Sequence, residues 1–162
     1  MSQIDSGLVL GALQAVLGEL YEGPEDPSGT WVVDNLPKSG ILGTMEGLTS
    51  EQASRIPIPG RSSIAGHAHH LRFSLELLER WSRGEDPFAD AKWEESWRVQ
   101  TVTESEWRDL QQALRHGARF WQEAVAQPRE WDDIAFTGAI ASAAHAGYHL
   151  GAIRHLAALV SP

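Results

Sequence analysis

The stretch AHAGYHLGAIR, residues 144–154, places His145 and His149 four positions apart in a segment with helical periodicity. In an α-helix this spacing puts two imidazoles side by side on one face. Earlier in the chain, residues 63–71 (SIAGHAHHL) carry three more histidines: His67, His69 and His70. A helix that faces the pair can add a third nitrogen, which completes the minimum ligand set of an open divalent-metal site inside a helical bundle.

Four segments have the apolar spacing of amphipathic helices. They run from about Val9 to Gly23, from Ser62 or Ser63 to about Gly84, from Thr103 to Pro128, and from Asp132 or Asp133 to Pro162. The third opens with a capping box, in which Thr103 and Glu106 satisfy each other's backbone donors. No segment is rich in strand formers. The sequence therefore predicts an all-α fold, a four-helix bundle formed by one domain of residues 1–162.

Two long connections follow the first and second expected helices, at about 24–61 and 85–102. Loops of this length are uncommon inside a domain and often line a functional site. In the first, residues 49–52 (TSEQ) resemble the start of a short helix. The second places Phe88, Trp93 and Trp97 in a polar stretch, and we expect it to fold over the bundle, either as a lid over a substrate or as part of the core.

Composition removes several classes of function. The chain has no cysteine, so a metal site must use histidine, carboxylate or water. Its net charge of −9 and its two lysines argue against nucleic-acid binding, because phosphate contacts dominate that affinity. No apolar run approaches the roughly 20 residues of a membrane span, and the N-terminus lacks the basic region of a signal peptide. We expect a cytoplasmic protein that is not associated with a membrane.

Helical rotation of about 100° per residue predicts which histidines face inward. His67 and His70 fall on the apolar stripe of their helix, whereas His69 falls on the polar side and is not expected to be a ligand. His145 and His149 lie about 40° apart, and the wheel places them centrally on an apolar face. Residues on that face include Ile134, Gly138, Ala141, Ala152, Leu156 and Leu159.

A single inward histidine is more often a hydrogen-bonded core residue than a metal ligand. Four of them are harder to explain in that way, because each buried ring needs partners for two nitrogens. The spacing is HxxxH, with Ala146 where a zinc protease of the HExxH type has its glutamate. No Glu-x-x-His occurs, which excludes the carboxylate-rich di-iron pattern. Ligation by three histidines suits zinc, nickel, copper or ferrous iron.

These segments resemble the DinB-like superfamily. Residues 63–75 (SIAGHAHHLRFSL), closed by Arg83-Gly84, look like the second helix of that family, and residues 144–154 look like its last helix. Members are four-helix bundles that bind a divalent metal through one histidine of the second helix and an HxxxH pair of the last. The resemblance covers essentially the whole chain, but only these two segments are distinctive.

The resemblance implies that His70, His145 and His149 bind the metal, with zinc or nickel as the first candidates. The assignment of His70 rests on its spacing from Ile64 and on the apolar residue that follows it. His67 remains a rival or an auxiliary residue. Bundles of this family are often dimers, and a homodimer would be consistent with Leu150 and Ala157, which we expect outside the main apolar stripes.

Relatives in the superfamily include enzymes that use low-molecular-weight thiols, such as bacillithiol and mycothiol, and others regarded as metal-dependent hydrolases. We therefore expect a metal-dependent enzyme that acts on a small-molecule substrate by hydrolysis or by thiol transfer. An open metal can lower the pKa of bound water or of an incoming thiol. Tyr148 and His67 are candidates for an additional acid or base, or they serve only in packing. The alternative is a bundle that binds a metal or a small ligand without catalysis.

Overall fold

The computed structural model describes residues 6–161, and all regular structure within that range is helical. Residues 1–5 and Pro162, which the predicted domain includes, lie outside the described residues. The four long helices are α1 (Ser6–Glu22), α4 (Ile64–Ser82), α5 (Glu104–Ala126) and α6 (Asp133–Val160). The prediction of an all-α helical bundle is confirmed.

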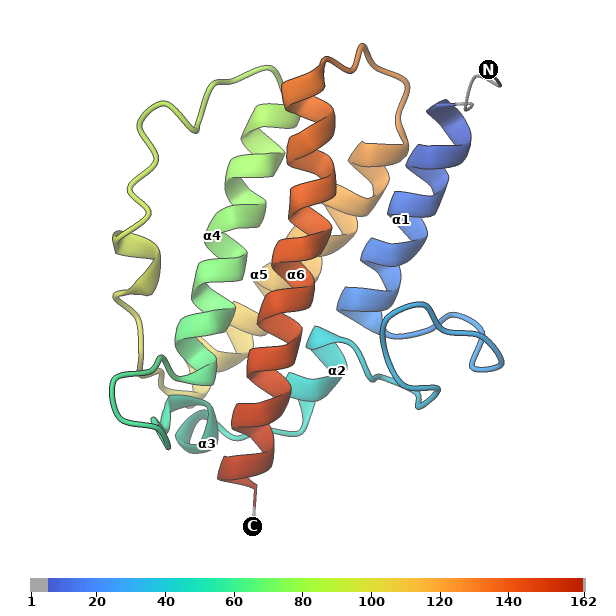
Figure 1. Cartoon of the computed structure of the whole chain (residues 1–162). Helices are drawn as coiled ribbons and strands as arrows, with labels where there is room; N and C mark the ends of the chain where they lie inside the picture. Colours follow the sequence, from blue (N-terminus) through green and yellow to red (C-terminus); the bar gives the residue numbers. More distant parts are fainter. Residues whose placement is uncertain (1–5, 162) are drawn as a thin grey trace.

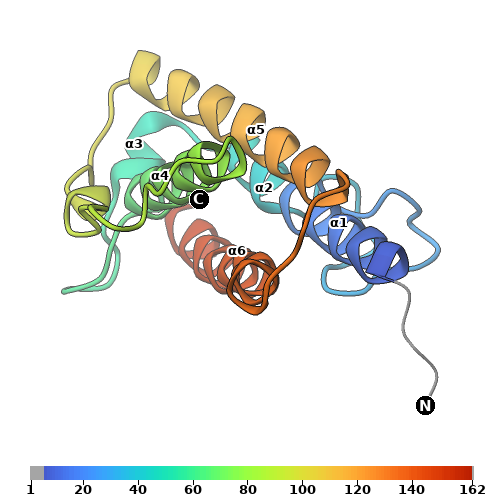
Figure 2. The same cartoon turned by 90° about the horizontal axis from the view of Figure 1, so that it is seen from above.

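The long helices surround one core. Helix α5 packs against α4 and α1, and α6 packs against the same two helices from the other side (Figures 1 and 2). The centre is filled by large, fully buried side chains, among them Leu17, Leu71, Trp107, Leu114, Trp121 and Ile153. Burial of each aliphatic side chain in this set contributes roughly 1.5–3 kcal/mol, so the helices are held together chiefly by their apolar stripes.

Capping residues set the helix boundaries. The side chains of Ser63, Thr103 and Asp132 each accept a hydrogen bond from a backbone N–H in the first turn of α4, α5 and α6. The predicted capping box of Thr103 and Glu106 is present. Each cap contributes about 1 kcal/mol and fixes where its helix begins. For α4 and α6, this start also sets the position of the histidines along the helix.

The first long connection contains two short helices, α2 (Ile41–Glu46) and α3 (Ser50–Ser54). Helix α3 begins at the expected place, with Thr49 and Gln52 forming a capping box. Helix α2 was not predicted, although Ile41 and Met45 are fully buried. Six residues are too few for an apolar period to be recognised in the sequence.

The second connection, residues 83–103, is long because α4 and α5 are neighbours that run in the same direction. The chain leaves α4 at the top of Figure 1 and must return to the bottom before α5 begins. On the way it forms a 3₁₀ turn, η1 (Glu95–Trp97), against α4. We call residues 83–103 the crossover connection. Such crossovers occur in bundles whose neighbouring helices are not all antiparallel.

Gln100 ties the crossover connection to the start of α4. The backbone N–H of Ser63 donates to Oε1 of Gln100 at 2.8 Å, and the Ser63 hydroxyl donates to the Gln100 carbonyl at 2.6 Å. Gly66 provides room for this clamp, because a Cβ there would come within 2.6 Å of the Gln100 Nε2. These hydrogen bonds hold the crossover connection at a fixed position along α4, beside its histidines.

The predicted inner face of α6 is wrong by about a quarter turn. Ile134 and Leu159 were expected inside but are 84% and 55% exposed. The buried stripe consists of Ala139, Ala146, His149, Leu150, Ile153, Leu156 and Val160. On the helical wheel the centre of this buried stripe lies roughly 90° from His145. His145 and His149 therefore lie toward one edge of the stripe and not at its middle. Because α6 is apolar on most sides, periodicity could not select its core face.

Leu150 corrects a further expectation. It was placed outside the main stripes as support for a homodimer, but it is 4% exposed and belongs to the core. Ala157 is half-buried and packs against that core. Leu150 therefore offers no free surface for a second copy. Separately, no helix within residues 6–161 is both long and apolar enough to cross a membrane.

Candidate metal centre

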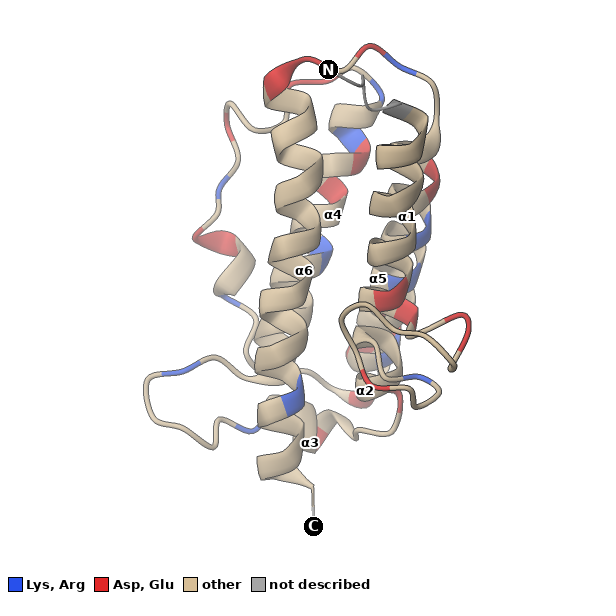
Figure 3. Cartoon of the chain, turned by 45° about the vertical axis from the view of Figure 1, so that its right-hand side comes forward, with Lys and Arg blue, Asp and Glu red and all other residues tan. Residues whose placement is uncertain are grey.

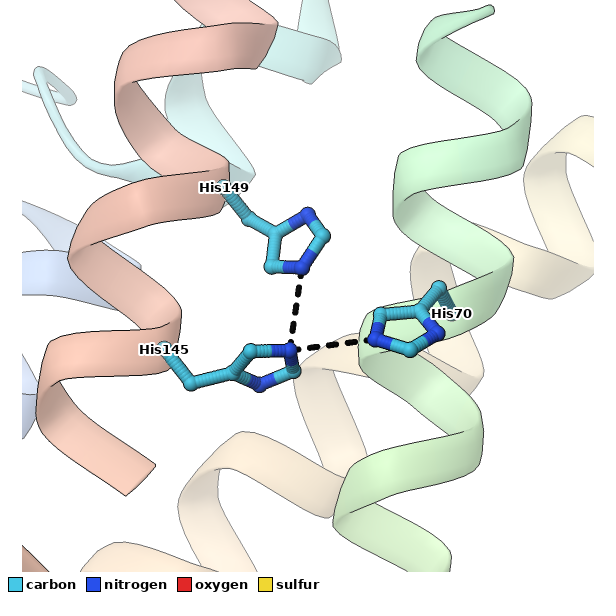
Figure 4. A group of neighbouring side chains, drawn as sticks. All are labelled: His70, His145 and His149. Carbon is cyan, nitrogen blue, oxygen red and sulfur yellow. Dashed lines mark hydrogen bonds between the residues drawn. The ribbon is translucent and has the colours of Figure 1, made fainter. Parts of the chain in front are cut away.

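Three imidazoles converge between α4 and α6 (Figure 4). Nε2 of His145 lies 3.1 Å from Nε2 of His70 and 3.0 Å from Nε2 of His149. One nitrogen from each of these residues lies within 4.8 Å of the other two. Three nitrogens on a tetrahedral zinc ion are about 3.3 Å apart, so one divalent cation can contact all three. The structure brings together the residues that the sequence had singled out.

The far nitrogen of His70 has a fixed partner. Nδ1 of His70 lies 2.7 Å from the Ser96 hydroxyl, which in turn donates to the Trp93 carbonyl at 2.6 Å. A carbonyl can only accept, so the Ser96 hydrogen is committed to it and Ser96 must accept from His70. The hydrogen of the neutral His70 ring is therefore on Nδ1. Its Nε2 lone pair faces the other two histidines.

His67 occupies the corresponding place behind His149. The two Nδ1 atoms are 2.9 Å apart, and both rings are buried. If His149 presents its Nε2 lone pair to a metal, its Nδ1 carries the hydrogen and donates to His67. Of the two candidates on α4, His70 lies in the group of three, and His67 contacts that group from behind.

Burial keeps these rings uncharged. It lowers the pKa of His70 to about 4, with a further contribution from the neighbouring His145. Burial also lowers the pKa of His149, and it does the same at His67 and His145. Neutral imidazole is the form that binds a metal, so the rings are ready to act as ligands near neutral pH.

Without a cation the group is not fully satisfied. His145 faces two nitrogens through its Nε2, and a neutral ring carries at most one hydrogen there. If His145 Nε2 carries the hydrogen, it can point it at His70 or at His149 but not at both. If His145 Nε2 is unprotonated, its lone pair faces the lone pair of His70. A positive ion between the three nitrogens removes this conflict. The donor set therefore fits a divalent cation on its own chemistry.

The tryptophan of η1 covers one side of the group. Trp97 stacks on His70, with ring centroids 4.2 Å apart and an angle of 17° between the planes. It also lies 5.8 Å from the His149 ring and meets His67 edge-on at 5.4 Å. The expectation that this segment folds over the bundle is confirmed. Ser96 was missed, because in the sequence it is one serine in a polar stretch.

The remaining candidates lie outside the group. Nδ1 of His69 donates to the Ser96 carbonyl at 2.8 Å, which fastens η1 to α4. Tyr148 is 67% exposed and touches His149 only by a ring contact, with centroids 5.0 Å apart. His155 is exposed. Tyr148 and His155 line a cavity of about 430 Å³ that also reaches His67.

A second cavity, of about 450 Å³, has His70 and His145 in its wall. We call it the apolar cavity, because most of its other lining residues are aliphatic or aromatic. Larger cavities of about 620 and 760 Å³ lie elsewhere and contain none of the three converging histidines. Of these cavities, the apolar cavity is the one that leads directly to the group.

Ser96→Ala is expected to weaken zinc binding about 10- to 100-fold, the usual effect of removing a partner that orients a ligand. The ring of His70 would lose the acceptor that fixes its hydrogen on Nδ1. Competition with a chelating dye at constant pH measures the affinity. Ser82→Ala is the control, because it removes a similar hydroxyl-to-carbonyl bond, to Glu79, away from the histidines. Equal affinities of Ser96→Ala and wild type would contradict this role.

Comparison with known families agrees with this picture. A family model described as the DinB superfamily matches residues 39–157, a range that includes α2 to most of α6 and all three converging histidines. No curated protein and no solved structure gives a significant match.

Proposed function

The chain belongs to the DinB superfamily, and from this premise we propose that it is a metal-dependent enzyme that binds one divalent cation through His70, His145 and His149. The observation that carries the proposal is the convergence of three Nε2 atoms, with Ser96 and His67 behind two of the rings. Ligand sets of three histidines leave coordination positions open, which is typical of catalytic sites. Zinc and nickel are the first candidates for the cation.

The proposed reaction is hydrolysis or the transfer of a low-molecular-weight thiol to a small-molecule substrate. When bound, the cation would supply Lewis acidity, which lowers the pKa of a water or thiol that reaches it. The chain itself contributes orientation and shielding. Ser96 and His67 hold two rings, Trp97 keeps water from one side, and the apolar cavity holds the substrate beside His70 and His145.

The test combines metal content with turnover. Protein purified without a His tag is expected to bind one zinc or nickel ion per chain. Ester-hydrolysis and thiol-conjugation assays are expected to show activity that falls at least about 100-fold in His145→Ala, a loss on the scale of removing one electrostatic contributor to catalysis. His116→Ala, which changes an exposed histidine of α5, is the matched control.

Two outcomes would contradict the proposal. Failure to take up zinc, nickel, copper or ferrous iron would exclude both a catalytic and a structural ion at these histidines. Stoichiometric uptake without turnover in either assay would favour the alternative, a helical bundle that binds a metal or small ligand without catalysis.

A further inference from the structure

The apolar cavity is bounded by four parts of the fold. Leu75 and Leu78 come from α4, and Phe88 and Trp93 come from the crossover connection. Helix α6 contributes small residues, and α1 contributes one tyrosine. Phe88 and Trp93 are 42% and 43% exposed, so their rings offer apolar surface to a molecule in the cavity. A volume of about 450 Å³ is within the range of small-molecule sites, roughly 300–1,000 Å³.

The two serine hydroxyls in the cavity wall are already used by the protein. Ser142 donates to the Ala139 carbonyl at 2.6 Å and accepts from the Trp121 indole N–H at 2.9 Å. Ser74 donates to the His70 carbonyl at 3.0 Å. Neither serine has a hydrogen left to donate to a ligand. An anionic ligand would therefore gain little from them.

The wall also carries no charge. Burial raises the pKa of Tyr21, so its phenol stays neutral. None of the lining residues is Asp, Glu, Lys or Arg. Helix α6 has no such residue between Asp133 and Arg154, and its ribbon is uncharged along that length in Figure 3. Within the cavity wall, a negatively charged ligand atom would find an opposite charge only at the point where His70 and His145 would hold a cation.

We propose that the apolar cavity binds a small, uncharged and largely apolar molecule that directs a single donor atom toward His70 and His145. This inference rests on the proposed function and names the substrate class of that site. A second ionised group on the ligand would lose its hydration inside the cavity without gaining a partner, which carries a large penalty. Thiols that carry a carboxylate are therefore disfavoured in this cavity, whereas an aromatic or aliphatic body is favoured by contact with Phe88 and Trp93.

The first test compares two thiols of the same shape on the zinc-loaded protein. Phenylmethanethiol is neutral and apolar, whereas para-(mercaptomethyl)benzoate adds a carboxylate at the far end of the same ring. Isothermal titration calorimetry is expected to give at least about tenfold weaker binding of the benzoate, because that carboxylate has no cationic partner in the wall. Equal affinities would overturn the inference.

A matched pair of variants locates the binding. Ala141 lines the cavity and Ala144 does not, although both are exposed alanines of α6. Ala141→Leu fills part of the space and is expected to weaken phenylmethanethiol binding about tenfold or more, while Ala144→Leu leaves it unchanged. Leucine is a good helix former, so both variants should fold. Phe88→Ala removes an apolar wall and is also expected to weaken binding. Equal binding to wild type and Ala141→Leu would show that the ligand lies elsewhere.

A metal-free arm separates this inference from the proposed function. Toluene has no donor atom, so its binding to chelator-treated protein, followed by proton NMR, tests the cavity alone. If zinc is not taken up but toluene binds and Ala141→Leu weakens that binding, the inference about the apolar cavity is supported and the proposed function fails. If zinc is taken up but toluene does not bind and the two thiols bind alike, the cavity inference fails and the metal site stands.

Discussion

Saturating zinc or nickel is expected to raise the melting temperature of the metal-free protein by about 8–16 °C, and His149→Ala is expected to abolish that rise. An ion at about 1,000 times its dissociation constant stabilises the folded state by about 4 kcal/mol. For a chain of this size, each kcal/mol corresponds to about 2–4 °C. The substitution is made at His149 because it is the most buried of the three histidines and both of its nitrogens face other histidines. Differential scanning calorimetry with and without the ion measures the shift.

The matched control is His116→Ala, which removes an exposed imidazole from α5 and should leave the ion-dependent shift intact. Metal-free His149→Ala must also melt cooperatively. A cooperative transition shows that the loss of the ion-dependent rise in melting temperature is not caused by unfolding of the variant. Similar shifts in wild type and His149→Ala would mean that His149 does not bind the ion.

The helices and the histidines could be predicted because their signals are local. The starts of α4, α5 and α6 follow from capping residues, and the ends of α1, α4 and α5 follow from Gly or Pro, which act within one turn. The spacing of His145 and His149 requires only that their segment be helical. The helical wheel put both His67 and His70 on the inward stripe, which depends on α4 alone. The resemblance to the DinB-like superfamily then favoured His70.

The rest depended on contacts between distant parts of the chain. No local pattern links Ser96 to His70, because the link exists only once the crossover connection has returned along α4. The core face of α6 was predicted wrongly for a related reason. Its residues are small or apolar on most sides, so the neighbouring helices decide which ones are buried. The choice between His67 and His70 likewise depended on the distance between α4 and α6.

The crossover connection links the candidate metal centre with the apolar cavity. Its Ser96 and Trp97 contact the histidines, while its Phe88 and Trp93 line the cavity. A substitution in this segment can therefore alter metal affinity and ligand binding together. Ala141, in contrast, belongs to α6 and to the cavity alone, which is why the variant at that position separates the two effects.

A buried carboxylate in α1 organises a part of the fold that the sequence did not predict. Glu19 is 6% exposed, and its oxygens accept hydrogen bonds of 2.7–2.9 Å from the backbone N–H groups of Trp31, Val32 and Val33. Burial alone would raise the pKa of Glu19, but these three donors outweigh it and hold the pKa below its ordinary value. The adjacent Asp34 pairs with Arg154 of α6, so this turn joins α1 to the helix that carries His145 and His149.

Glu19→Gln is expected to lower the free energy of unfolding by about 2–4 kcal/mol at neutral pH. The amide replaces charge-assisted hydrogen bonds with neutral ones, and its NH₂ group faces backbone N–H donors instead of accepting from them. Urea denaturation, followed by circular dichroism, measures the difference from wild type. Glu25→Gln, which changes an exposed carboxylate of the connection that follows α1, is the control and is expected to cost under about 0.5 kcal/mol.

The pH dependence gives this prediction a second, independent readout. Because the pKa of Glu19 is lower in the folded protein than the value of 4.5 typical of an unperturbed glutamate, its stabilisation is fully present above that pH. As the pH falls through the folded-state pKa, the carboxylate is protonated and the contribution disappears. The gap in stability between wild type and Glu19→Gln should therefore narrow in acid, whereas the gap caused by a packing defect would stay constant. A gap that does not change with pH would show that the turn at Trp31 is held by its packing and not by the charge of Glu19.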